Sequence, residues 1–193
     1  MLKRIYDWCV ASADKPYSLW ILSAVAFAES SFFPIPPDVM LIPMSLAQPK
    51  RAWLYATVCT IASVLGGLLG YAIGALLYDS IGHWLIQLYG LGDKVEAFRE
   101  SYARWGAVII LLKGLTPIPY KLVTITSGFA GYNIVLFTLC SIVARGGRFF
   151  VAALLMNRYG DWIRVRVERH LALFAAILLA VLVLGFVIAF KMI

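Results

Sequence analysis

The same proline-rich break occurs twice in apolar stretches of this chain, and it limits how those stretches can fold. Pro34, Pro36 and Pro37 form the first break, and Pro117 and Pro119 form the second, which begins 83 positions later. Proline cannot donate a hydrogen bond within a helix, and it moves the preceding residue away from helical angles. Inside a bilayer the freed backbone groups are tolerated only where protein or a water-filled cavity satisfies them. We therefore expect both segments to fold back or unwind, as at a transport or translocation site.

The composition indicates a membrane protein. Of the 193 residues, 62% are hydrophobic and 14% are charged, and the mean hydropathy is +0.86, so polar surface is too scarce to cover a soluble particle. A single membrane domain over residues 1–193 is expected. The net charge of +7 comes mostly from Lys and Arg at the ends of apolar runs, which set topology and attract anionic lipid head groups. No basic face with interleaved aromatic residues exists, so nucleic acid is not an expected partner.

The cysteines indicate packing rather than metal binding. Cys9, Cys59 and Cys140 lie in or beside apolar segments, are odd in number and lack the spacing of metal ligands. We expect no disulfide framework, no metal and no cofactor.

Three apolar segments are long enough to span a membrane as helices. Residues 53–78, 134–156 and 171–190 each approach or exceed the ~20 residues that cross a hydrocarbon core of ~30 Å. The segments that contain the proline breaks, 17–47 and 106–130, are interrupted too early to span. Each of these two is predicted to be a re-entrant helical hairpin.

This assignment predicts an all-α polytopic membrane protein with an inverted repeat. A hairpin returns to its own side, so each repeat, 17–78 and 106–156, crosses the membrane once, and the second repeat is inverted. The two hairpins then enter from opposite faces and meet near the midplane, as in transporters with broken helices. The span at 171–190 follows as a C-terminal helix. With the N-terminus in the cytoplasm, nine Lys and Arg residues lie inside and four outside, in agreement with the positive-inside rule.

Two further patterns predict anchoring and packing. Between the repeats, residues 91–105 carry apolar positions at helical spacing with charges on the other faces, which is typical of an amphipathic helix in the membrane interface. Gly66, Gly70 and Gly74 form a stripe on the first span that would let another helix approach closely. We expect that helix to belong to a hairpin of the same chain, with homodimerisation as the alternative.

Six ionisable residues lie far from any expected membrane edge and form the candidate site: Glu29, Asp38, Lys113, Lys121, Arg145 and Arg148. The two acids flank the first break, the two lysines flank the second, and the two arginines lie three positions apart on one helix face. Each such charge costs at least ~2.5 kcal/mol to insert, so it should face a partner or a cavity. In an inverted repeat the acidic hairpin would meet the basic one.

The charge balance of this set favours an anionic ligand. Two acids against four bases leave an excess of about +2, which suits a phosphate group, because arginine binds phosphate with a rigid fork and lysine as a point charge. Protonation of Glu29 or Asp38 would raise the positive potential and release a basic partner, which would couple transport to a proton gradient. In the alternative interpretation, the acids and lysines only form buried ion pairs that hold the hairpins together.

Taken together, the motifs resemble the DedA family of bacterial inner-membrane proteins, within the SNARE-associated or VTT-domain superfamily. The resemblance rests on the glycine stripe, the two arginines, and the motifs Glu29-x4-Pro34-x-Pro36-x-Asp38 and Lys113-x3-Pro117-x-Pro119-x-Lys121. It implies a polytopic carrier with two re-entrant hairpins whose charged residues are functional. Members are tied to moving undecaprenyl phosphate or phospholipids between leaflets and to maintaining the proton-motive force. In the second motif this chain has lysines and two prolines where the family's usual motif has arginines and one proline. The chain is most similar to the short YqaA-like branch.

The leading hypothesis is a transporter or flippase that moves a lipid phosphate between the leaflets of a bacterial inner membrane, with protons as the candidate coupling ion. Alternatives are a proton-coupled exporter of small ions or drugs, and a membrane assembly factor without a transported substrate. An enzyme acting on lipid phosphates is not expected. No histidine lies near the two arginines, and no aspartate cluster suits a catalytic metal.

Overall fold

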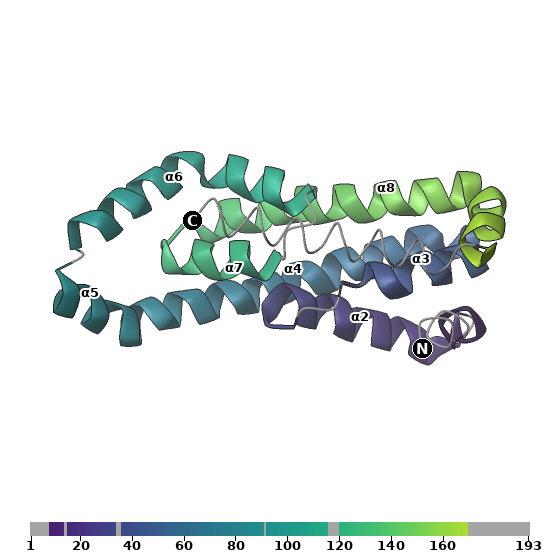
Figure 1. The fold of residues 1–193 in the computed structure, drawn as a ribbon, viewed down its shortest axis with the longest axis horizontal. Coiled ribbons are helices and arrows are strands. Elements are labelled where there is room, and N and C mark those ends of the chain that lie inside the picture. The colour runs from purple at the N-terminus through teal and green to yellow at the C-terminus, as the bar shows by residue number, and fades with distance from the viewer. Residues whose placement is uncertain (1–7, 14, 34–35, 91, 116–119, 170–193) are drawn as a thin grey trace.

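The computed structural model describes residues 8–13, 15–33, 36–90, 92–115 and 120–169, and this part of the chain is helical, with no strand (Figure 1). The all-helical expectation is therefore confirmed for these residues. The elements are α2 (Pro16–Ser31), α3 (Asp38–Ala47), η1 (Pro49–Arg51), α4 (Ala52–Leu77), η2 (Tyr78–Gly82), α5 (His83–Tyr89), α6 (Gly92–Leu115), α7 (Tyr120–Phe129) and α8 (Ile134–Arg169).

Four of the described helices pack around α4. Its 26 residues make it about 39 Å long at 1.5 Å per residue, and it contacts α2, α3, α7 and α8. A Cβ atom on Gly66 would lie 2.1 Å from the carbonyl oxygen of Phe27 in α2, and one on Gly74 would lie 2.0 Å from that of Ile125 in α7. Gly70, between them, lies against both helices. The glycine stripe thus brings one helix from each predicted hairpin into backbone contact with α4.

The helices on the two sides of each proline break run in opposite directions (Figure 1). Helix α2 runs toward the middle of α4 and α3 runs back, whereas α6 approaches the middle from the opposite end and α7 returns toward that end. The two reversing pairs meet there, because α2 contacts α7. Pro37 precedes the first residue of α3 as its N-cap. Pro36 is also described, whereas Pro34, Pro117 and Pro119 lie outside the described residues.

Helix α6 differs from the expected division of the second half. Residues 91–105 are expected as a separate interfacial helix and 106–130 as a hairpin, but α6 is continuous from Gly92 to Leu115. No proline lies in this stretch to end the helix. Gly106, at the expected boundary, serves close packing, since a Cβ atom there would lie 2.6 Å from the ring of Tyr132. The first arm of the expected second hairpin is therefore the end of a longer helix.

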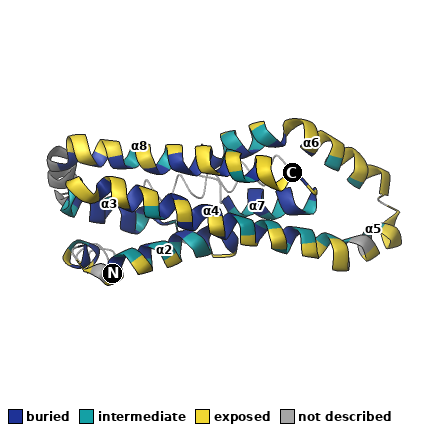
Figure 2. Ribbon diagram, turned by 180° about the vertical axis from the view of Figure 1, so that it is seen from behind, coloured by how far each residue is buried: buried dark blue, intermediate teal, exposed yellow. Residues whose placement is uncertain are grey.

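Among the described residues, two helical stretches are long and apolar enough to cross a membrane, Pro49–Ser80 and Ile134–Gly160. They coincide with the predicted spans 53–78 and 134–156, except that α8 continues to Arg169. The third predicted span, 171–190, lies outside the described residues. The outward faces of the bundle are exposed (Figure 2) and carry large apolar side chains, among them Trp20 at 79% and Leu76 at 66% exposure. A surface of this kind suits contact with lipid.

Candidate functional site

Two carboxylates of the first helix pair are buried next to α8. Glu29 lies in the last turn of α2 and Asp38 is the first residue of α3, and they are only 8% and 6% exposed. The positive end of the α3 dipole favours the negative charge of Asp38. Each carboxylate forms a salt bridge with an arginine of α8, Glu29 with Arg145 and Asp38 with Arg148.

Arg145 is enclosed by a network of hydrogen bonds. Its side chain is 1% exposed, its Nη2 donates to Glu29 Oε2 at 2.5 Å, and its Nε donates to Ser63 Oγ at 2.5 Å. The hydroxyl of Ser63 lies 2.6 Å from that of Ser30, which donates to the same Glu29 oxygen at 3.2 Å. Side chains from α2, α4 and α8 therefore close around this charge. A buried ion pair is tolerated only with such additional hydrogen bonds.

Two aromatic rings complete the surroundings of Arg145. Its guanidinium carbon lies 4.8 Å from the ring centroids of both Tyr120 and Phe149, within the ~6 Å over which a cation and a ring attract. Tyr120 begins α7, and its hydroxyl donates to Ser141 Oγ at 2.6 Å. Arg145 is thus the point at which both helix pairs and both long helices converge.

Arg148 is held less completely than Arg145. It follows Arg145 by three residues, so both guanidinium groups lie on one face of α8. Its side chain is 23% exposed and donates to Asp38 Oδ2. Among the described residues, no other side chain bonds to Arg148. Its exposed surface is where a second anion can approach.

The salt-bridge partners of the two acids are arginines, not the lysines of the second hairpin as expected. Lys121, in the first turn of α7, is partly exposed, and its ammonium group donates to the carbonyl oxygen of Phe32 at 3.5 Å. Lys113 lies in the last turn of α6 and is also partly exposed. The tips of the two helix pairs do meet, but α8 packs directly against α3 and α4 and brings its arginines to the carboxylates.

Several polar residues of the site were not predicted from the sequence. Ser30, Ser63 and Thr124 are buried at the junction of the two helix pairs, where Thr124 Oγ1 donates to the carbonyl oxygen of Ser30 at 3.1 Å. Ser63 lies one turn before Gly66, on the packed face of α4. A small polar residue on a glycine-lined helix face is the signal that could have identified it.

The chemistry available here is the binding and exchange of ions. In the part of the chain that the structure describes, no three His, Cys, Asp or Glu side chains gather so that they could hold a metal ion. The groups that are gathered are carboxylates, guanidinium groups, hydroxyls and aromatic rings. Such groups can hold an anion and release it again.

A comparison with known protein families matches residues 35–158 to the VTT domain, a range that includes all the candidate charges except Glu29. A protein of Haemophilus influenzae is 33% identical over 180 residues, which cover 92% of this chain and 93% of that protein. One of Histophilus somni is 33% identical over 158 residues, which cover 82% and 80%. Both relatives are described as uncharacterized proteins. No solved structure matches the chain.

Proposed function

The chain belongs to the VTT domain family, and on this premise we propose that it moves a lipid phosphate between the leaflets of a bacterial inner membrane. Proteins of this family are membrane-associated and generally transporter-like. Candidate substrates are undecaprenyl phosphate and anionic phospholipids. The substrate is carried and not converted.

In this proposal the reversing pairs α2–α3 and α6–α7 are re-entrant hairpins of an inverted repeat. Their approach from opposite ends and their contact near the middle of α4 support this topology (Figure 1). The charges at the tips would then lie at mid-depth of the bilayer, where each costs at least ~2.5 kcal/mol unless it is paired or hydrated. A hydrated crevice between the tips would admit a phosphate group while the hydrocarbon chains stay in lipid.

The contrast between the two arginines carries the proposal. Arg145 is 1% exposed and bonded on several sides, so its role is to hold the helices together. Arg148 is 23% exposed and is held by one carboxylate. Its guanidinium group can bind phosphate through two parallel N–H donors, and Lys121 at the neighbouring tip adds a point charge. A phosphate that replaces Asp38 at Arg148 would keep the arginine paired throughout transport.

Protons are the natural coupling ion for this exchange. A proton on Asp38 removes the negative charge that holds Arg148 and leaves the guanidinium group to the phosphate. When that proton leaves, the salt bridge between Asp38 and Arg148 forms again and displaces the phosphate. Movement of the lipid in one direction would then follow the proton gradient.

Transport in liposomes tests the proposal. The purified protein should move a fluorescent phosphatidic acid from one leaflet to the other without altering it. Arg148→Gln should slow this movement about tenfold, because a hydrogen bond to a charged group contributes ~1.5 kcal/mol or more. Arg104→Gln, which removes an exposed arginine of α6, is the matched control and should leave the rate unchanged.

Three results would contradict the proposal. Equal rates of lipid movement for the wild-type protein and Arg148→Gln would show that Arg148 does not bind the phosphate group. A chemically altered lipid would indicate an enzyme. Movement of small ions with no movement of lipid would indicate the exporter instead.

A further inference from the structure

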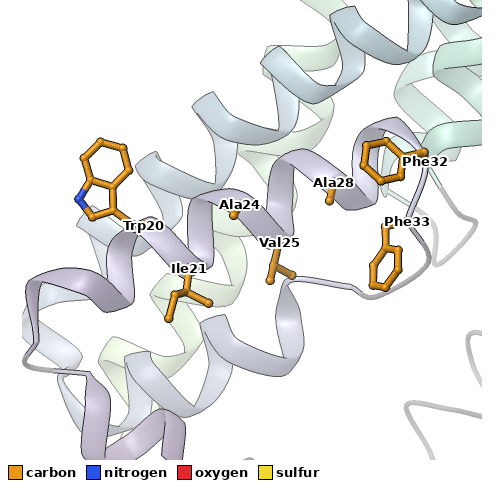
Figure 3. A pocket seen from close by; sticks show the side chains of 7 residues that line it. All are labelled: Trp20, Ile21, Ala24, Val25, Ala28, Phe32 and Phe33. Carbon is orange, nitrogen blue, oxygen red and sulfur yellow. The ribbon is translucent and has the colours of Figure 1, made fainter.

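The outer face of α2 carries a groove that the charged site does not use. It has a volume of about 520 Å³, and its lining residues are all apolar (Figure 3). Trp20 stands at one end and Phe32 and Phe33 at the other, with the small side chains of Ala24 and Ala28 between them (Figure 3). The Trp20 and Phe32 side chains are 79% and 61% exposed. Their rings therefore project at the two ends of a shallow apolar surface.

The length of this groove matches one leaflet of a bilayer. Trp20 and Phe32 are twelve residues apart, which corresponds to about 18 Å of helix at 1.5 Å per residue. Half of a hydrocarbon core of ~30 Å is ~15 Å. One extended hydrocarbon chain lying along α2 would therefore reach from the outer part of a leaflet to the tip of the helix pair.

A cation lies at the tip end of the groove. The ammonium group of Lys121 donates to the carbonyl oxygen of Phe32, the residue whose ring closes that end. An ammonium group has three N–H donors, and this carbonyl oxygen, at 3.5 Å, is the acceptor that the described residues give it. With respect to the described residues, Lys121 therefore keeps donors for an anion that arrives at the end of an apolar groove.

From the apolar lining, the length and the cation, we propose that the groove seats one hydrocarbon chain of a lipid phosphate whose phosphate group is bound at Lys121. This inference rests on the function proposed above and adds the position of the tail, which lies against α2 while the phosphate is in the crevice. A neutral lipid lacks the group that Lys121 binds. The groove therefore selects an anionic lipid.

Photo-crosslinking of the full-length protein in liposomes tests this inference. The probes are phosphatidic acid and diacylglycerol, each with a diazirine group in one chain, and mass spectrometry identifies the labelled peptides. Phosphatidic acid should label residues 20–33, and Lys121→Gln should reduce this labelling about tenfold, or ~1.4 kcal/mol. Labelling of the wild-type protein by diacylglycerol should be as weak as labelling of the Lys121→Gln variant by phosphatidic acid.

A groove-filling variant and a matched control complete the experiment. Ala24→Trp adds a ring at an exposed position of the groove and should abolish labelling. Val143→Trp adds the same ring to α8 at a residue that is itself 64% exposed, and it should leave labelling unchanged. Equal labelling by both probes would show an ordinary lipid-facing surface and overturn the inference.

Two further outcomes separate this inference from the proposed function. An unlabelled groove in a protein that does move phosphatidic acid would mean that another segment or a second copy covers α2, and it would overturn the inference alone. Selective labelling of the groove in a protein that moves no lipid would support the groove as a binding site and contradict the proposed transport.

Discussion

Neutralising Glu29 should destabilise the protein far more than neutralising Asp38, although both carboxylates are buried and both pair with an arginine. Glu29→Gln keeps the size of the side chain but leaves the Arg145 charge, 1% exposed, without a counter-charge. Breaking a buried pair in this way costs about 3 kcal/mol or more. Asp38→Asn leaves Arg148, which is 23% exposed and can turn toward water. The loss there should be about 1 kcal/mol, the upper end of what an ion pair with access to water contributes.

Thermal unfolding in one detergent, followed by tryptophan fluorescence, measures this difference. For a chain of this size, 1 kcal/mol shifts Tm by about 2–4 °C, so we expect a fall of about 6–12 °C for Glu29→Gln and of about 2–4 °C for Asp38→Asn. The double variant Glu29→Leu with Arg145→Leu should recover most of the loss, because apolar side chains often replace a buried ion pair without cost. Equal falls in Tm for the two single variants would refute the reasoning that exposure of the arginine decides the penalty.

Three further predictions concern packing and topology. Gly66→Ala should lower the free energy of unfolding by ~1–3 kcal/mol, since its Cβ would lie 2.1 Å from a carbonyl oxygen of α2. The Cβ of Gly146→Ala would meet only a methyl group at 3.5 Å, so this variant should raise the free energy of unfolding by up to ~1 kcal/mol. Thermal unfolding measures both changes. Tyr120→Phe keeps the ring on the neighbouring guanidinium group and should cost ~1 kcal/mol, and Tyr120→Leu should cost more. In a cysteine-free background, Pro49→Cys and Asn133→Cys should react with a membrane-impermeant maleimide from opposite sides; labelling from one side only would eliminate the inverted topology.

The all-helical fold and the first residues of the two long helices could be predicted from the sequence. The predicted spans begin at 53 and 134, and the long helices of the structure begin at Ala52 and Ile134. Composition, helix length and the geometry of proline are local properties, so they can be read without knowing which helices touch. The helix boundary that we expected near residue 106 is absent, because a single glycine does not end a helix as proline does.

The pairing of charges was decided only by the tertiary structure. In the repeated motif Asp38 aligns with Lys121, and the sequence suggested that the two hairpins would neutralise each other. In the structure α8 packs on α3 and α4 and supplies Arg145 and Arg148 instead. Salt bridges depend on which helices are neighbours, and that depends on close backbone packing along α4 rather than on the spacing of charges. The charged groups of the candidate site can therefore be listed from the sequence, but only the fold shows which of them are buried in salt bridges and which remain accessible.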